Sequence, residues 1–102
     1  MSLDIVLLKS DGSVDEQLSI GVEDHYRLTQ LIGVTDGLMG RISDYYEDAK
    51  FENYELDELA VEAVKLSKLC FNDRKLSSFM EKFLRLIEIA KAKNEILMAV
   101  AD

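Results

Sequence analysis

Acidic and aromatic side chains are interleaved in residues 44–55, and these are the residue types in the chain best suited to chemistry at a surface. Tyrosine offers a large contact area with a polar tip, and carboxylates pair with the Arg and Lys side chains of a basic protein. The alternative is that Tyr45 belongs to the core and the other tyrosines lie on a helix surface. The candidate partner-binding residues are Asp44, Tyr45, Tyr46, Glu47, Asp48, Glu52, Tyr54 and Glu55.

Catalysis and metal binding have few residues to draw on. Asp44 and Asp48 are four positions apart and could bind a divalent cation or do acid–base work, but such aspartates on an exposed helix are usually only solvated. His25 is the one histidine and Cys70 the one cysteine, and we expect both to pack in the core, His25 with its ring on the sheet. We therefore expect no enzymatic activity, no metal and no cofactor, with a small carboxylate-based enzyme using His25 as an alternative.

The net charge of −8 is unevenly distributed. Residues 23–58 carry ten acids and three bases, whereas residues 59–102 carry six acids and eight bases. A field of this sign repels nucleic acid and anionic lipid and speeds the encounter with a basic protein. We expect a basic protein partner, and neither nucleic acid, a membrane nor a small-molecule substrate. The alternative is that the acidic surface only aids solubility.

A chain of 102 residues is the size of one domain, so residues 1–102 are expected to fold as a unit. One cysteine cannot form an intramolecular disulfide and is compatible with a reducing compartment. The N-terminus lacks a signal-peptide pattern, and no apolar run approaches the roughly 20 residues that span a bilayer. We expect a cytoplasmic protein.

A hairpin is expected at the N-terminus. Residues 3–9 and 14–22 flank Ser10-Asp11-Gly12-Ser13, and Asp-Gly between two such runs is a strong hairpin signal because Gly tolerates positive φ. The second run alternates with period two and has one polar face. The first run is apolar on both faces, so we expect it to be the more buried strand.

Helical spacing follows from residue 23. The pattern predicts a short helix at about 23–32 that stops at Gly33, and a second from about 36 to 49. Thr35 or Asp36 would cap this second helix, although Gly37 and Gly40 weaken its start. Its apolar stripe would be Leu38, Ile42, Tyr45 and Ala49.

Two further helices are expected in the second half. Residues 50–56 form a loop or a brief extended piece, after which Asp57 or Asn53 starts a helix that runs to about Leu69. The clearest helix begins near Arg74.

The C-terminal residues 95–101 could continue that last helix or form a strand. We favour a strand, which would lie beside the hairpin as its third strand, because a two-stranded hairpin alone is marginally stable. The expected fold class is α+β, with an N-terminal β-hairpin, three to four helices and a C-terminal third strand in the order ββααααβ.

The chain resembles small bacterial immunity proteins of contact-dependent growth inhibition and related polymorphic toxin systems. The resemblance covers most of the chain in layout, through the hairpin runs LDIVLLK and QLSIGVEDHYRL, the segment DYYEDAKF, the helix ELDELAVEAVKLSKL and the terminus ILMAVAD. It implies a cytoplasmic protein that neutralises a cognate toxin, often a basic nuclease, by occupying its active site. The alternative is an adaptor or regulatory subunit that binds a basic protein surface without toxin involvement.

Overall fold

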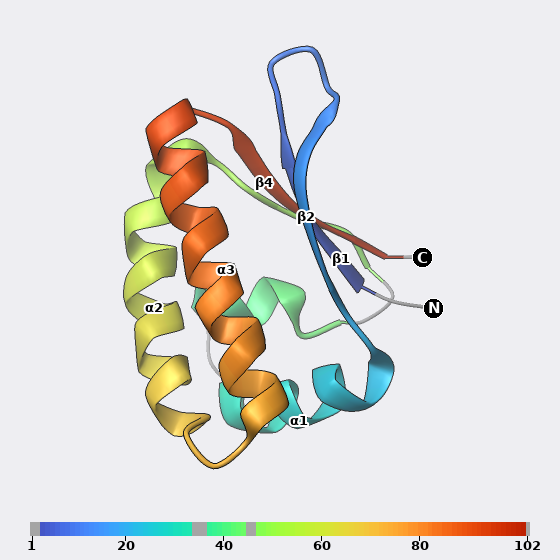
Figure 1. The fold of residues 1–102 in the computed structure, drawn as a ribbon, viewed down its shortest axis with the longest axis vertical. Helices are drawn as coiled ribbons and strands as arrows, with labels where there is room; N and C mark the ends of the chain where they lie inside the picture. The colour runs from blue at the N-terminus through green and yellow to red at the C-terminus, as the bar shows by residue number, and fades with distance from the viewer. Residues whose placement is uncertain (1–2, 34–36, 45–46, 102) are drawn as a thin grey trace.

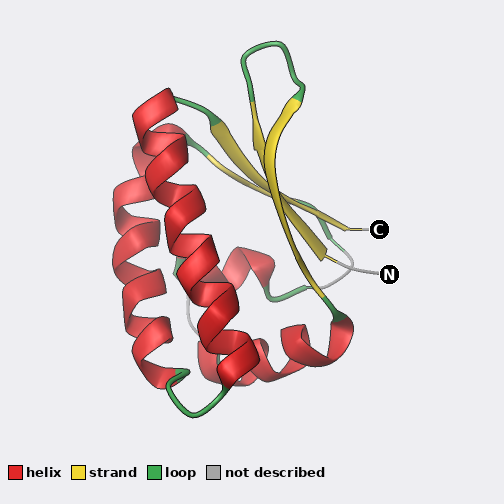
Figure 2. Cartoon of the chain, viewed as in Figure 1, coloured by secondary structure: helices red, strands yellow, loops and turns green. Residues whose placement is uncertain are grey.

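The computed structural model describes residues 3–33, 37–44 and 47–101. The expected α+β class is confirmed (Figures 1 and 2). The chain follows the order β1 (Leu3–Leu8), β2 (Val14–Ile20), α1 (Val22–Ile32), the 3₁₀ helix η1 (Leu38–Ile42), β3 (Ala49–Phe51), the 3₁₀ helix η2 (Asn53–Glu55), α2 (Leu56–Leu69), α3 (Arg74–Lys93) and β4 (Ile96–Ala101).

The described strands form one antiparallel sheet in the order β2-β1-β4-β3. The expected C-terminal strand is confirmed as β4, which lies beside β1 with Leu3 opposite Ala101 and Leu8 opposite Ile96. The doubly apolar first run is the more buried strand of the hairpin, as expected, and it lies at the centre of the sheet. A fourth strand, β3 (Ala49–Phe51), pairs with β4 at the edge of the sheet. It overlaps the start of residues 50–56, which were expected to form a loop or a brief extended piece.

The hairpin turn has the expected chemistry. Gly12 has φ 86°, a left-handed conformation that costs glycine little. The Asp11 carboxylate accepts hydrogen bonds from the Ser13 amide at 2.9 Å and the Ser13 hydroxyl at 2.6 Å. Leu7 pairs with Glu16 but Leu8 pairs with Val14, so Asp15 is the extra residue of a β-bulge.

The two long helices, α2 and α3, lie on one side of the sheet in Figure 1 and bury their apolar stripes between it and each other. In α3, the rings of Phe79 and Phe83 stack with centroids 5.9 Å apart. The helix begins at the predicted place because the Asp73 side chain accepts a hydrogen bond from the Leu76 amide at 3.2 Å. It ends at Asn94, which adopts the left-handed conformation with φ 56°.

The predicted helix at 36–49 is wrong. Of the residues described in this stretch, Leu38–Ile42 alone is helical, as a 3₁₀ helix, and Asp44 and Asp48 both lie outside it. Gly37 and Gly40 favour helix weakly, and Ala49–Phe51 finds hydrogen-bonding partners on β4 instead. The order ββααααβ is corrected accordingly, while the suggested cap at Thr35 or Asp36 and the core position of Tyr45 lie outside the described residues.

His25 and Cys70 are both buried, with 4% and 1% of their surfaces exposed. Nε2 of the His25 ring lies 2.6 Å from the carbonyl oxygen of Ile42 in η1. Burial raises the pKa of the Cys70 thiol, which disfavours the reactive thiolate. Within the described part of the chain, no helix combines the length and apolar character needed to cross a bilayer.

Candidate protein-binding face

The residues predicted to bind a partner lie on the segment that leads from η1 through β3 and η2, which we call the acidic segment (residues 44–55). Six of the eight are described, and five of these are exposed to solvent: Asp44, Glu47, Asp48, Glu52 and Tyr54. Tyr54 is 84% exposed, which is unusual for an aromatic ring. Tyr45 and Tyr46 lie outside the described residues.

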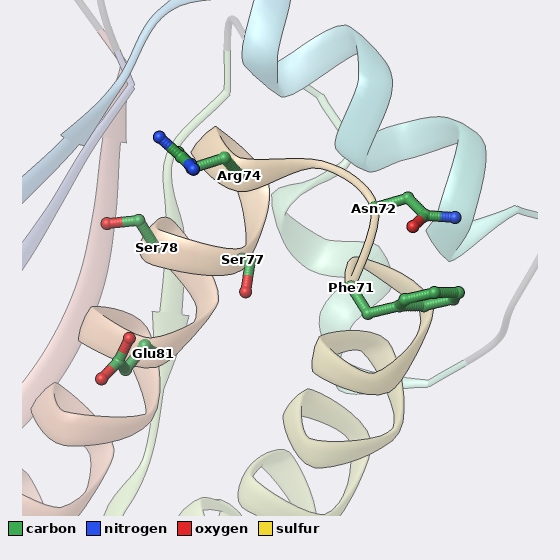
Figure 3. A pocket seen from close by; sticks show the side chains of 6 residues that line it. All are labelled: Phe71, Asn72, Arg74, Ser77, Ser78 and Glu81. Atoms are coloured by element: carbon green, nitrogen blue, oxygen red, sulfur yellow. The ribbon is translucent and has the colours of Figure 1, made fainter.

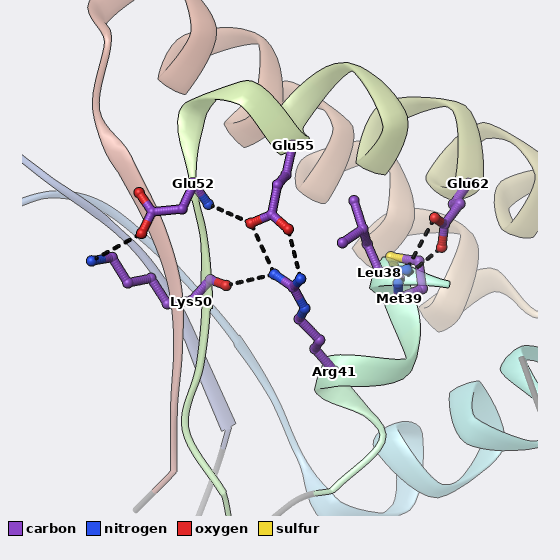
Figure 4. Close-up of polar contacts among 7 residues, drawn as sticks. All are labelled: Leu38, Met39, Arg41, Lys50, Glu52, Glu55 and Glu62. Carbon is purple, nitrogen blue, oxygen red and sulfur yellow. Dashed lines mark hydrogen bonds and ion pairs between the residues drawn. The ribbon is translucent and has the colours of Figure 1, made fainter. Parts of the chain in front are cut away.

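The sixth residue, Glu55, holds the segment in place. Its two carboxylate oxygens accept hydrogen bonds from Arg41 Nη1 at 2.9 Å and Nη2 at 2.6 Å (Figure 4). The same guanidinium donates to the carbonyl oxygen of Lys50 at 3.0 Å and lies 5.6 Å from the centre of the Phe51 ring. Hydrogen bonding to Arg41 lowers the pKa of Glu55 and keeps it ionised.

Glu55 also completes a capping box at the start of η2, because its Oε1 accepts a hydrogen bond from the Glu52 amide at 2.9 Å. Only 11% of the Glu55 side chain is exposed. Its charge is therefore used inside the molecule, and it positions the segment more than it presents itself to a partner.

Asp48 connects the middle of the acidic segment to the sheet. Its Oδ1 accepts a hydrogen bond from the amide of Ala101, at the end of β4, at 2.8 Å. Glu52 pairs with Lys50 at 3.3 Å across exposed side chains, and such pairs contribute little to stability. Exposed Glu52 and Tyr54 thus lie on a stretch, residues 48–55, that is held at both ends.

Sequence reasoning missed the residues that organise this segment. Arg41 lies outside the run of alternating acids and tyrosines, and Glu62 belongs to another helix. The Glu62 carboxylate accepts hydrogen bonds from the amides of Leu38 at 3.0 Å and Met39 at 2.9 Å, which fixes the start of η1 (Figure 4). No local pattern marks either contact, because each joins residues well separated in the chain.

The described residues outside the acidic segment were also predicted to offer little for metal binding. They contain no group of three His, Cys, Asp or Glu side chains placed to bind a metal ion. A hollow of about 500 Å³ at the α2–α3 turn is lined by Phe71, Asn72, Arg74, Ser77, Ser78 and Glu81. Figure 3 shows Phe71 and Asn72 directed away from Arg74 and Ser78, so these side chains do not meet at one point.

Comparisons with protein-family models, with curated proteins and with solved structures gave no match to this chain.

Proposed function

We propose that this protein acts by binding another protein, a cationic one, through the acidic segment, and that it is an immunity protein that neutralises a cognate toxin. The partner would be a basic nuclease. Its active-site groove, lined with Lys and Arg to hold phosphates, would accept the carboxylates of Asp44, Glu47, Asp48 and Glu52 in their place.

The observation that carries this proposal is that the acidic segment exposes its side chains to solvent while hydrogen bonds hold part of its backbone in place. Five of its six described candidate residues are exposed, while Glu55 and Asp48 fasten its backbone to Arg41 and Ala101. Because residues 48–55 are held at both ends before binding, this part of the segment loses less conformational entropy when the partner arrives. Exposed Tyr54 adds an aromatic contact of the kind enriched at binding hot spots.

The charge of the residues around the acidic segment also favours a cationic partner. Residues 43–58 contain seven acids and one base. That base, Lys50, is paired with Glu52, and nearby Arg41 is paired with Glu55. A cationic surface approaching this side of the molecule therefore meets a negative potential, which steers its encounter.

The test uses the purified protein as bait in a lysate of the cells that produce it. We expect the wild-type protein to retain a basic protein, and the double charge reversal Asp44→Lys/Glu47→Lys to retain at least about tenfold less of it. The matched control is Glu81→Lys/Glu88→Lys, which makes the same change in net charge on exposed positions of α3. Circular dichroism would check that each variant is folded.

The captured protein must then be assayed for its own activity. We expect a nuclease activity that falls to zero when one equivalent of the wild-type protein is added. A captured protein with unaffected activity would identify an adaptor and refute the immunity function. Equal capture by the wild-type and the Asp44→Lys/Glu47→Lys protein would refute the acidic segment as the binding face.

A further inference from the structure

The side of the sheet that faces away from α2 and α3 is apolar where an uncovered sheet is usually polar. Side chains alternate along a strand, so Leu3, Ile5 and Leu7, all fully buried, point toward the helices. The residues between them on β1 and β4 point the other way. We call the following set the outer face: Asp4, Val6, Leu8, Ile96, Met98 and Val100.

The strand register brings these apolar side chains together into one stripe. Val6 lies opposite Met98, and Leu8 lies opposite Ile96, on the two central strands of the sheet. Directly opposed side chains on one face of an antiparallel pair are about 5 Å apart, so they touch. Val6 is 6% exposed, and the other four apolar residues are half-buried.

No described helix covers this face. In Figures 1 and 2, the described helices pack on the opposite side of the sheet or below it. Antiparallel strands with one solvated face normally alternate apolar and polar residues, whereas strands covered on both faces read as continuous apolar runs. The runs LDIVLL and ILMAVA belong to the second kind. Their composition fits a sheet that is covered on both faces, whereas the described helices cover one face.

The borders of the outer face differ in charge and so indicate what covers it. On the β2 side the stripe is flanked by the neutral residues Gln17 and Ser19, which pair with Val6 and Asp4. On the β3 side it is flanked by the acidic segment: Lys50 lies opposite Met98, with Glu52 bonded to it, and Asp48 bonds the end of β4. An apolar centre with a polar rim is the usual anatomy of a protein interface.

We propose that the outer face is the central contact surface for a cationic protein, with the acidic segment as its charged border. The partner would place apolar side chains on Val6, Leu8, Ile96, Met98 and Val100 and would direct Lys or Arg side chains toward the β3 side. This inference rests on the proposed function and extends it, because it locates the apolar core of the same interface.

The test uses three short synthetic peptides of equal length as probes: alternating Lys–Leu, alternating Lys–Ser and alternating Glu–Leu. Each is titrated into the ¹⁵N-labelled protein while backbone amide shifts are recorded. We expect the Lys–Leu peptide to bind most tightly, with its largest shifts at β1 and β4. We expect the triple variant Ile96→Thr/Met98→Thr/Val100→Thr to weaken its binding by about tenfold or more, because apolar contact area is lost.

A matched control separates the face from apolar surface in general. Val61→Thr/Val64→Thr removes exposed apolar side chains from α2 and is expected to leave peptide binding unchanged. Threonine is β-branched and suits a strand, so the triple variant should fold, and the dispersion of its amide spectrum will show whether it does.

The outcomes separate this inference from the proposed function. If both Lys peptides bind equally and shift only residues 44–55, the acidic segment binds cations but the outer face is refuted. If neither Lys peptide binds, both proposals fail. If the protein dimerises in sedimentation experiments and the triple variant is monomeric, the outer face belongs to a second copy of this chain and the cationic partner is refuted there.

Discussion

The carboxyl group of Glu95 is buried at the point where the chain passes from α3 into β4. The residue is 7% exposed, and its Oε1 has no hydrogen-bond partner among the described residues. Burial, and then the neighbouring carboxyl group of Asp15, raise the pKa of Glu95. Asp15, the bulge residue of β2, accepts a hydrogen bond from Lys93 at 3.0 Å, and the bonds from Lys93 and Glu95 lower the pKa of Asp15. Of these two neighbouring carboxyl groups, Glu95 is therefore the one that binds a proton more readily.

This arrangement predicts how stability depends on pH. The pKa of Glu95 in the folded state is above its ordinary value of 4.5, so the stability that its proton contributes is present below that pH. It is lost as the pH rises through the raised pKa. The variant Glu95→Gln keeps a neutral side chain at every pH, so we expect its melting temperature to match the wild type near pH 4 and exceed it by a few degrees at pH 7.

The control for this experiment is Glu88→Gln, at an exposed position of α3, whose difference from the wild type should be small at both pH values. The pH dependence that Asp15 contributes has the opposite sign. Its pKa is lowered in the folded state, so its contribution to stability is present above the ordinary pKa of 3.8 and is lost as the pH falls. Thermal unfolding between pH 3 and 8 would separate the two. A Glu95→Gln protein that is less stable than the wild type at pH 7 would contradict the raised pKa of Glu95.

The role of a single residue could be predicted from the sequence only where its neighbours in the sequence decide that role. The clustering of acids and tyrosines identified Glu47 and Glu52 as exposed candidates, and the structure places both at the surface. The same pattern could not separate Glu55 from them, because its pairing with Arg41 depends on how η1 packs beside η2. The burial of Glu95 against Asp15 was missed for the same reason.

Elements with strong local patterns were predicted well. The Asp-Gly turn, the boundaries of α2 and α3 and the strand nature of β4 follow from periodicity and capping, and all are confirmed. The helix predicted at residues 36–49 was wrong because the spacing of Leu38 and Ile42 fits a helix, whereas contacts with distant residues decide the conformation of this stretch. The β3 strand has three residues and exists through pairing with β4, nearly 50 positions later.

The Glu62 carboxylate is one such distant determinant, and it can be tested. It accepts hydrogen bonds from the amides of Leu38 and Met39, which would otherwise be unsatisfied at the start of η1. We expect Glu62→Ala to lower the free energy of unfolding by about 1–2 kcal/mol, because hydrogen bonds to a charged acceptor are lost. Urea denaturation would measure the change.

The control for this element is Glu58→Ala, one turn earlier on α2 and exposed, where we expect a change below about 0.5 kcal/mol. Gly37→Ala provides a second test of the same contact. A β-carbon at Gly37 would clash with Glu62 Oε1, so the carboxylate would have to move away from the two amides. If Glu62→Ala and Glu58→Ala were equally stable, η1 would not depend on this cap.

At the scale of the whole molecule, the outer face could not be found from sequence. The apolar character of both LDIVLL and ILMAVA indicated buried strands, but which face each residue shares with which neighbour depends on strand order and register. Those are properties of pairing between the two ends of the chain. The acidic border and the apolar stripe become one surface only when β4 inserts between β1 and β3.

The acids and the apolar stripe of the proposed interface should affect binding kinetics differently. Long-range attraction acts before contact, whereas apolar burial acts after it, so the acids should control association and the stripe dissociation. For the captured cationic protein, we expect Asp44→Lys/Glu47→Lys to lower the association rate by about tenfold at low salt. Raising the salt concentration from about 50 to about 500 mM should lower the wild-type rate similarly, because the Debye length shortens.

The triple variant Ile96→Thr/Met98→Thr/Val100→Thr should instead raise the dissociation rate by about tenfold and leave association, and its salt dependence, close to wild type. Surface plasmon resonance measures both rates on the same samples, with Val61→Thr/Val64→Thr and Glu81→Lys/Glu88→Lys as the matched controls for the stripe and the acids. Since the acidic segment borders only the β3 side, steering should orient the partner before the stripe is covered. A triple variant that slows association as strongly as the charge reversal would contradict this division of roles.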